Sequence, residues 1–144
     1  MEIRILGPGD VAVLDKVAPD VFDDPLDSAA TREFLRDPRH HLVVAIDDGV
    51  VVGFASAVHY VHPDKPAPEL WINEVAVAST HLRRGIGKAI LERLFGHARD
   101  HGCVEAWVLT DRANTAAMRL YESSGGIAAA PDSVMFEFPL DGDT

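Results

Sequence analysis

The decisive stretch of this 144-residue chain is Arg83-Arg84-Gly85-Ile86-Gly87-Lys88, a glycine-rich turn between an apolar segment and a helical one. A turn that leads from a buried strand into a helix gathers unpaired backbone N–H groups at the positive end of the helix dipole, which favours an anion. We predict that Gly85 and Gly87 let a phosphate approach this backbone. Arg83 and Arg84 support this, because cations there are unfavourable by about 0.3–1 kcal/mol each unless an anion is bound. An ordinary exposed turn is the alternative.

The segments that flank the turn predict a strand and a helix. Residues 70–77 are apolar at both alternating sets of positions, as expected for a central strand covered on both faces. From Arg84 to His101, apolar residues recur at three- and four-residue steps, and Gly102 follows as a left-handed stop. A strand over 104–110 comes next, so the strand–helix–strand unit predicts a parallel pair with a right-handed crossover.

Shorter patterns predict the remaining elements. Asp47-Asp48-Gly49 separates two β-branched segments and is a strong hairpin signal. In chain order, the predicted elements are a strand over 2–6, a helix capped by Asp10, a helix capped by Ser28, antiparallel strands over 41–46 and 50–61, a proline-rich loop over 62–68, a helix over 114–124 that ends at Gly125, and a last strand over 133–138.

The composition indicates one globular domain over residues 1–144, with 47% hydrophobic and 25% charged residues. The sequence shows no leader-like N-terminus and no run near the roughly 18 apolar residues that span a bilayer, so we expect a cytoplasmic protein without a membrane partner. Cys103, the only cysteine, fits a reducing compartment. The net charge of −10 argues against a nucleic-acid partner and favours a cationic substrate, although a merely solubilising charge is an equal alternative.

Two longer motifs resemble those of the GNAT superfamily of N-acetyltransferases. Residues 77–87 are similar to its acetyl-coenzyme A (acetyl-CoA) signature, and residues 114–125 are similar to its later helix; a P-loop and a dinucleotide fingerprint are both absent from the sequence. The resemblance implies an α/β (α+β) fold: a mixed, mostly antiparallel sheet of six to seven strands with a parallel central pair, flanked by four helices. The chain departs from the pattern at Leu82, where the family usually has Arg or Gln, and at Gly126, where it often has Phe and where we expect a looser turn.

Acetyl transfer to an amine needs a neutral amine, a stabilised oxyanion and a proton for the thiolate. Glu74 is the only charged residue in 70–77, so it is the candidate general base, acting directly or through water; a structural carboxylate is the alternative. The resemblance implies that Tyr121 is the general acid rather than a core residue, and that the Val75 N–H binds the oxyanion. It also implies acetyl-CoA contacts from Val75, Ala76, Val77, Leu82, Arg83, Arg84, Gly85, Ile86, Gly87, Lys88, Asn114 and Ala117.

The resemblance narrows to the type I aminoglycoside 3-N-acetyltransferases through the stretches 21–25, 72–87, 120–121 and 134–138, together with Asp111. It implies direct transfer, in a ternary complex, to a primary amine of a polycationic aminoglycoside antibiotic. The carboxylates that would face this amino sugar are Asp23, Asp24, Glu74, Asp111 and Glu137. Another small amine, such as a polyamine or an amino acid, is one alternative, and a non-catalytic acyl-CoA-binding regulator is another. The oligomeric state stays open, with a homodimer as one option.

The histidines do not predict a metal site. His40 and His41 are adjacent on a strand, where their side chains point apart, and His97 and His101 lack a third ligand. We interpret the four-residue spacing of His97 and His101 as a solvated helix face.

Overall fold

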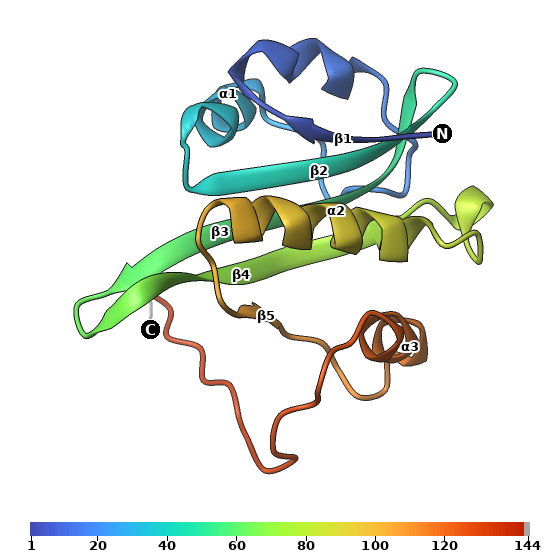
Figure 1. Cartoon of the computed structure of the whole chain (residues 1–144). Helices are drawn as coiled ribbons and strands as arrows, with labels where there is room; N and C mark the ends of the chain where they lie inside the picture. Colours follow the sequence, from blue (N-terminus) through green and yellow to red (C-terminus); the bar gives the residue numbers. More distant parts are fainter. Residues whose placement is uncertain (143–144) are drawn as a thin grey trace.

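The computed structural model describes residues 1–142, which form a five-stranded sheet in the order β1-β2-β3-β4-β5 (Figure 1). The strands are β1 (Glu2–Leu6), β2 (His40–Asp47), β3 (Val50–His62), β4 (Lys65–Val77) and β5 (Ala106–Val108). Neighbouring strands are antiparallel except β4 and β5, which are parallel. The mixed, mostly antiparallel sheet and its parallel pair are confirmed, but in the described chain that pair lies at one edge and the predicted count of six to seven strands is wrong.

Four helices flank the sheet in the described chain: the 3-10 helix η1 (Pro8–Asp15), α1 (Ser28–Arg36), α2 (Ile86–Asp100) and α3 (Thr115–Ser123). A three-residue 3-10 turn, η2 (Ser79–His81), leads toward α2. None of the helices in residues 1–142 is long and apolar enough to cross a membrane. The predicted helix count is therefore confirmed, with a 3-10 helix as the first member.

The core lies between the sheet and helices on both of its faces. Figure 1 shows α2 across one face of β3 and β4, while η1 and α1 lie beyond β1 and β2. Ile90, Leu91 and Leu94 of α2 are fully buried, and each large side chain buried in this way contributes about 1.5–3 kcal/mol. Gly53 of β3 lies directly beneath α2, because a Cβ built there would be 3.1 Å from Cδ1 of Ile90. Docking on the sheet thus holds α2 in place.

The β2–β3 hairpin forms as predicted. Asp48 (φ 50°) and Gly49 (φ 77°) both adopt left-handed backbone angles, which two-residue hairpin turns of the primed type require. The neighbouring prediction of a proline-rich loop over 62–68 is wrong, because β3 runs to His62 and β4 begins at Lys65. Pro66 and Pro68 fall where the register shifts between Tyr60 and His62, and a bulge tolerates residues that lack an N–H donor.

Both predicted helix caps are wrong by a few residues. Gly7 is the N-cap of η1, while Asp10 lies inside the helix and accepts a hydrogen bond from the Gly7 N–H at 2.8 Å. Asp27, not Ser28, caps α1, and its side chain accepts from the Ala30 N–H at 2.8 Å. A carboxylate and a hydroxyl are similar in preference at this position, so sequence alone did not separate Asp27 from Ser28.

The predicted last strand over 133–138 does not form, and the strand expected over 104–110 shortens to Ala106–Val108. Val134, Met135, Phe136 and Phe138 are each at least 65% exposed. A strand needs an edge with free N–H and C=O groups, and β5 offers an edge of only three residues. The alternating pattern of 133–138 therefore lacks a long partner in the described chain.

Candidate active site

A bulge in β4 creates the opening of the site. Ser56 pairs with Glu74 and Ala57 pairs with Ile72, so Asn73 is the additional residue on β4. Bulges bend a strand and raise its local twist. The pairing of β4 with β5 covers only Leu70–Ile72, and Asn73 and Glu74 are exposed. The prediction that residues 70–77 are covered on both faces is therefore wrong for the C-terminal half of β4.

The backbone of β4 beyond the bulge has open polar groups on the β5 side. The Ala78 N–H donates to the Val52 carbonyl at 2.8 Å, and antiparallel pairing directs alternate residues toward the partner strand. The N–H and C=O groups of Val75 and Val77 therefore point away from β3, where β5 no longer pairs. Ala76 points the other way and pairs with Phe54, so its main chain is already used.

The glycine-rich turn presents the start of α2 without a side-chain cap. Gly85 is the N-cap with φ 76°, and Arg83 also has a left-handed φ of 63°. Alternation with left-handed residues makes successive backbone N–H groups converge on an anion-binding concavity. Asp20 fixes the approach to this turn, because its carboxylate accepts the Ser79 N–H at 2.8 Å. The first-turn N–H groups of α2 thus face a turn that is held in shape from outside.

Gly87 has a different role from the one predicted. It is buried, and a Cβ added there would lie 3.1 Å from Cδ2 of Leu120 on α3. The missing side chain at Gly87 lets α3 pack on α2, so close approach of a phosphate to this residue is not the reason for the glycine. Gly85, with open space around it and a positive φ, fits the original reasoning on conformational grounds.

A cavity of about 320 Å³ opens on the face of the sheet opposite α2. It brings together three of the predicted substrate-binding residues, Asp23, Asp24 and Glu74. Phe22 anchors the acidic loop, because its ring stacks on Phe54 of β3 with centroids 4.1 Å apart. The apolar and polar side chains that line the cavity are Leu14, Phe22, Asp23, Asp24, Pro25, Leu26, Asp27, Ala30, Thr31, Phe34, Leu42, Phe54, Ser56 and Glu74.

The surroundings of Glu74 disfavour its charged form. Desolvation in the cavity raises the pKa of this carboxyl above its ordinary value, and the negative charges of Asp23 and Asp24 raise it further. A carboxyl group with a raised pKa is a stronger base once ionised, which is what proton abstraction from an ammonium group requires. This cluster is the strongest electrostatic feature of the cavity.

Two predicted substrate residues do not line the cavity. Asp111 lies between β5 and α3, where its side chain accepts the Ala113 N–H at 3.1 Å. Glu137 is exposed in the segment that does not form a strand. Sequence reasoning also missed Ser56, which lines the cavity opposite Glu74. A lone hydroxyl in the apolar run of β3 was a signal, but only the register of β3 on β4 places it in the site.

Helix α3 carries the other predicted catalytic residue. Asn114 is its N-cap and accepts the Ala117 N–H at 3.1 Å, so one carbonyl oxygen of Asn114 is engaged within α3. Tyr121 packs against the core, and burial raises the pKa of its hydroxyl. The Gly126 N–H donates to the Tyr121 carbonyl at 2.8 Å and closes the helix, so the looser turn expected at Gly126 is wrong.

Folding also changes the prediction for the histidines. His41 of β2 supplies the third imidazole that His97 and His101 lack in sequence, and the ligand atoms of the three lie within 4.8 Å of one another. Burial, and then the neighbouring histidines, lower the pKa of His41 to about 3. The interpretation of His97 and His101 as a simple solvated face is therefore wrong.

Solved structures share this fold of a mixed sheet that opens between β4 and β5 ahead of a glycine-rich helix start. An aminoglycoside acetyltransferase from an uncultured soil metagenomic sample, in complex with trehalose, superposes with a TM-score of 0.82 and 22% identity, covering 96% of this chain and 95% of that one. An aminoglycoside N-acetyltransferase in complex with CoA gives a TM-score of 0.75 and 23% identity, with 96% and 94% coverage. The chain belongs to the acetyltransferase (GNAT) family, whose model matches residues 11–126.

Curated relatives have different acceptors in their names. The N-alpha-acetyltransferase RimI of Mycobacterium tuberculosis is 36% identical over 105 residues, which are 73% of this chain and 63% of RimI. A mycothiol acetyltransferase of Thermomonospora curvata is 35% identical over 127 residues, which are 81% of this chain and 40% of that protein. The chain thus spans less than two thirds of the length of these relatives. Acetyl-CoA is the co-substrate of the family.

Proposed function

We propose that this chain is an acetyl-CoA-dependent N-acetyltransferase whose acceptor is a primary amine of a small polycationic molecule of the aminoglycoside class. The observation that carries the proposal is the cavity in which Glu74 meets Asp23 and Asp24. Three carboxylates around one cavity favour a ligand with several ammonium groups, because each unpaired carboxylate there is otherwise destabilised by its neighbours.

The donor would bind where backbone N–H groups are open. The uncapped first turn of α2 fits the pyrophosphate, with Arg83 and Arg84 beside it. The outward main-chain groups of Val75 and Val77 fit the amide-bearing arm, since they continue β4 at the point where β5 ends. Side-chain exposure of Leu82, at 55%, leaves its backbone as the only polar contribution it offers.

The acceptor would meet the donor at β4. Glu74 takes a proton from the ammonium group, directly or through water, and the freed amine attacks the thioester carbonyl carbon. A C–N bond forms, the Val75 N–H stabilises the negative charge on the carbonyl oxygen, and the C–S bond then breaks. Tyr121 gives its hydroxyl proton to the departing thiolate. The second amine proton and the tyrosinate are balanced by exchange with solvent, so neither side chain is consumed.

A protein N-terminal amine is the second candidate acceptor, and the RimI relative favours it. An N-terminal α-amine carries one positive charge, so it would use less of the carboxylate cluster than an aminoglycoside. Mycothiol-type, polyamine and amino-acid acceptors, and a non-catalytic acyl-CoA-binding role, complete the set of alternatives.

The deciding experiment measures thiol release from acetyl-CoA with a panel of amines at equal concentration. The panel holds aminoglycosides, a polyamine, free amino acids, a deacetylated mycothiol precursor and a peptide with a free N-terminus. We expect the highest kcat/KM with an aminoglycoside. Turnover confined to the peptide would replace the acceptor by a protein N-terminus. Tight binding of acetyl-CoA without turnover of any amine would replace the enzyme by a regulator.

A further inference from the structure

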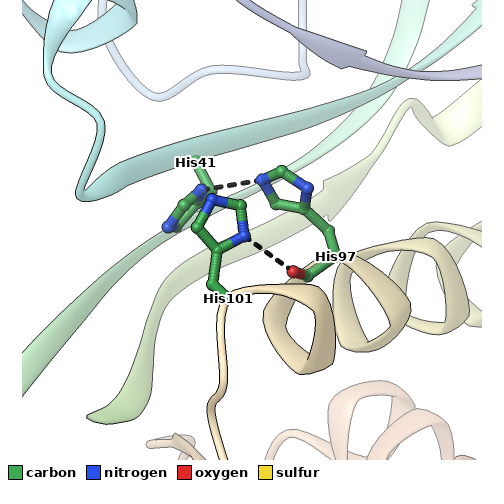
Figure 2. Close-up of side chains that lie close together, drawn as sticks. All are labelled: His41, His97 and His101. Carbon is green, nitrogen blue, oxygen red and sulfur yellow. Dashed lines mark hydrogen bonds between the residues drawn. The ribbon is translucent and has the colours of Figure 1, made fainter.

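Four histidines from three elements gather at the C-terminal end of α2. His41 comes from β2, His59 from β3, and His97 and His101 from α2. Figure 2 shows the rings of His41, His97 and His101 turned toward one another. The ring centroids lie 4.8 Å apart for His41 and His97, 5.0 Å for His41 and His101, and 4.4 Å for His97 and His101. The fold, rather than a local sequence motif, makes this cluster.

The hydrogen bonds at the cluster identify a free ligand atom on His101. Its Nδ1 lies 2.9 Å from the His97 carbonyl oxygen, which can only accept, so Nδ1 carries the proton. In the neutral ring the other nitrogen, Nε2, then has an unshared electron pair. Metal-bound histidines hold their second ring nitrogen in this way, commonly by donation to a backbone carbonyl.

His41 and His97 already have nearly the separation that one metal ion would impose. Nδ1 of His41 is 3.0 Å from Nε2 of His97. Two nitrogens bound at about 2.0–2.1 Å to one tetrahedral zinc ion lie about 3.3 Å apart. Nε2 of His41, the other ring nitrogen, is 2.8 Å from Nδ1 of His59. His59 thus holds the ring of His41 in the orientation that points Nδ1 at His97.

We infer that His41, His97 and His101 bind one divalent late first-row transition-metal ion, with zinc as the expected ion and His59 as the residue that orients His41. Three neutral imidazoles form a ligand set that suits zinc, copper and nickel, and does not suit magnesium or calcium, which prefer oxygen. A water molecule completes four-fold coordination, since His101 is exposed to solvent. The bound ion cross-links the end of α2 to β2.

The site lies away from the proposed acetyl-CoA turn. Ten residues of α2 separate Gly87 from His97, which corresponds to about 15 Å along the helix axis. The inference stands apart from the acetyltransferase proposal for this reason, and a binding measurement tests it whether or not the chain transfers an acetyl group.

The test uses the full chain without any added histidine tag, stripped with a chelator and titrated with zinc chloride in a calorimeter. We expect one site per chain and a rise in Tm on zinc addition, because a ligand that binds only the folded state stabilises it. Cobalt(II) provides a second probe, whose visible absorption reports tetrahedral nitrogen coordination. The variants are His97→Ala and His101→Ala, both on the accessible face of α2, so that loss of the buried His41 is not needed.

The two ligand variants should lose more than the roughly 10–100-fold in affinity that removal of an orienting partner typically costs, and His59→Ala should lose about that amount. His62→Ala is the matched control, because His62 pairs with Glu69 at 2.9 Å at the far end of β3 and should leave zinc binding unchanged. Wild-type binding that persists in His97→Ala and His101→Ala would overturn the inference, as would the absence of both heat and a Tm rise at millimolar zinc.

Discussion

Glu74 shares its cavity with two carboxylates, and this sets a pH dependence that can be moved by mutation. The pKa of Glu74 is raised first by desolvation and then by Asp23 and Asp24. Asp23→Asn or Asp24→Asn removes one negative neighbour and should lower the pKa of Glu74. We expect the acidic limb of the kcat/KM profile to move to lower pH in these variants. Asp111→Asn, outside the cavity lining, is the control and should leave that limb in place.

The same raised pKa predicts a gain in stability when the charge is removed. A carboxyl group whose pKa is higher in the folded state binds more protons there, so its contribution to stability falls as the pH rises from the unfolded pKa through the folded pKa. At neutral pH, Glu74→Gln should therefore raise the free energy of unfolding while lowering kcat by about 10²–10⁴-fold. Urea unfolding at pH 7 and at a pH below both pKa values checks this, because the stability difference should shrink at the lower pH. Full activity in Glu74→Gln would contradict its role as the base.

Tyr121 offers a test of the proposed acid with little risk to the fold. Burial raises its pKa, so the hydroxyl keeps its proton throughout the neutral range. Tyr121→Phe keeps the ring that packs on the core and removes only the proton donor. We expect kcat to fall by about 10²–10⁴-fold, the range of general acid catalysis, with little change in Tm. An unaltered pH–rate profile in Tyr121→Phe would remove this residue from the mechanism.

Single residues differ in how far sequence alone can place them. Glu74 stands out because one charge interrupts an apolar strand, and that contrast needs no knowledge of tertiary structure. Ser56 and His41 reach their sites only through the register of β3 on β4 and the docking of α2 on β2. Asp111 and Glu137 were placed by resemblance of short stretches, and neither lines the cavity.

The packing of α3 on α2 depends on one glycine, and a second glycine in the same helix is its control. A Cβ at Gly87 would lie 3.1 Å from Leu120, whereas a Cβ at Gly96 meets nothing within 4 Å. Gly87→Ala should cost about 1–3 kcal/mol as an overpacked contact and raise the KM for acetyl-CoA. Gly96→Ala should stabilise the chain by about 0.5–1 kcal/mol through helix propensity alone. Chemical denaturation measures both, and equal effects at the two glycines would contradict the proposed contact.

Elements with strong local signals were predictable, and elements set by neighbours were not. Helix α2 and the β2–β3 hairpin form where periodicity and the Asp47-Asp48-Gly49 turn place them. The bulge at Asn73 has no counterpart in the local pattern, because it exists only relative to the register of β3. The segment 133–138 has the alternation of a strand, yet pairing also needs an open edge, and the short β5 does not provide one.

At the scale of the whole molecule, charge separates the two proposed ligands. The chain carries a net charge of −10, with Asp23, Asp24 and Glu74 concentrated at the cavity, while Arg83 and Arg84 stand at the start of α2. A polycationic acceptor is attracted by both the overall field and the local carboxylates. An anionic donor is repelled by the overall field and attracted only by the local turn. Salt screens these terms, because the Debye length falls from about 30 Å at 0.01 M to about 3 Å at 1 M.

We therefore expect kcat/KM for the polycationic acceptor to fall steeply as the ionic strength rises, with the loss mainly in KM. The value for acetyl-CoA should change less, since screening weakens the overall repulsion and the local attraction together. Steady-state kinetics across a sodium chloride series, with the second substrate saturating, measures both slopes. The variant Asp23→Asn should flatten the acceptor slope and leave the acetyl-CoA slope unaltered. Parallel slopes for the two substrates would show that the carboxylates of the cavity do not hold the acceptor, and a singly charged N-terminal amine would then be the better candidate.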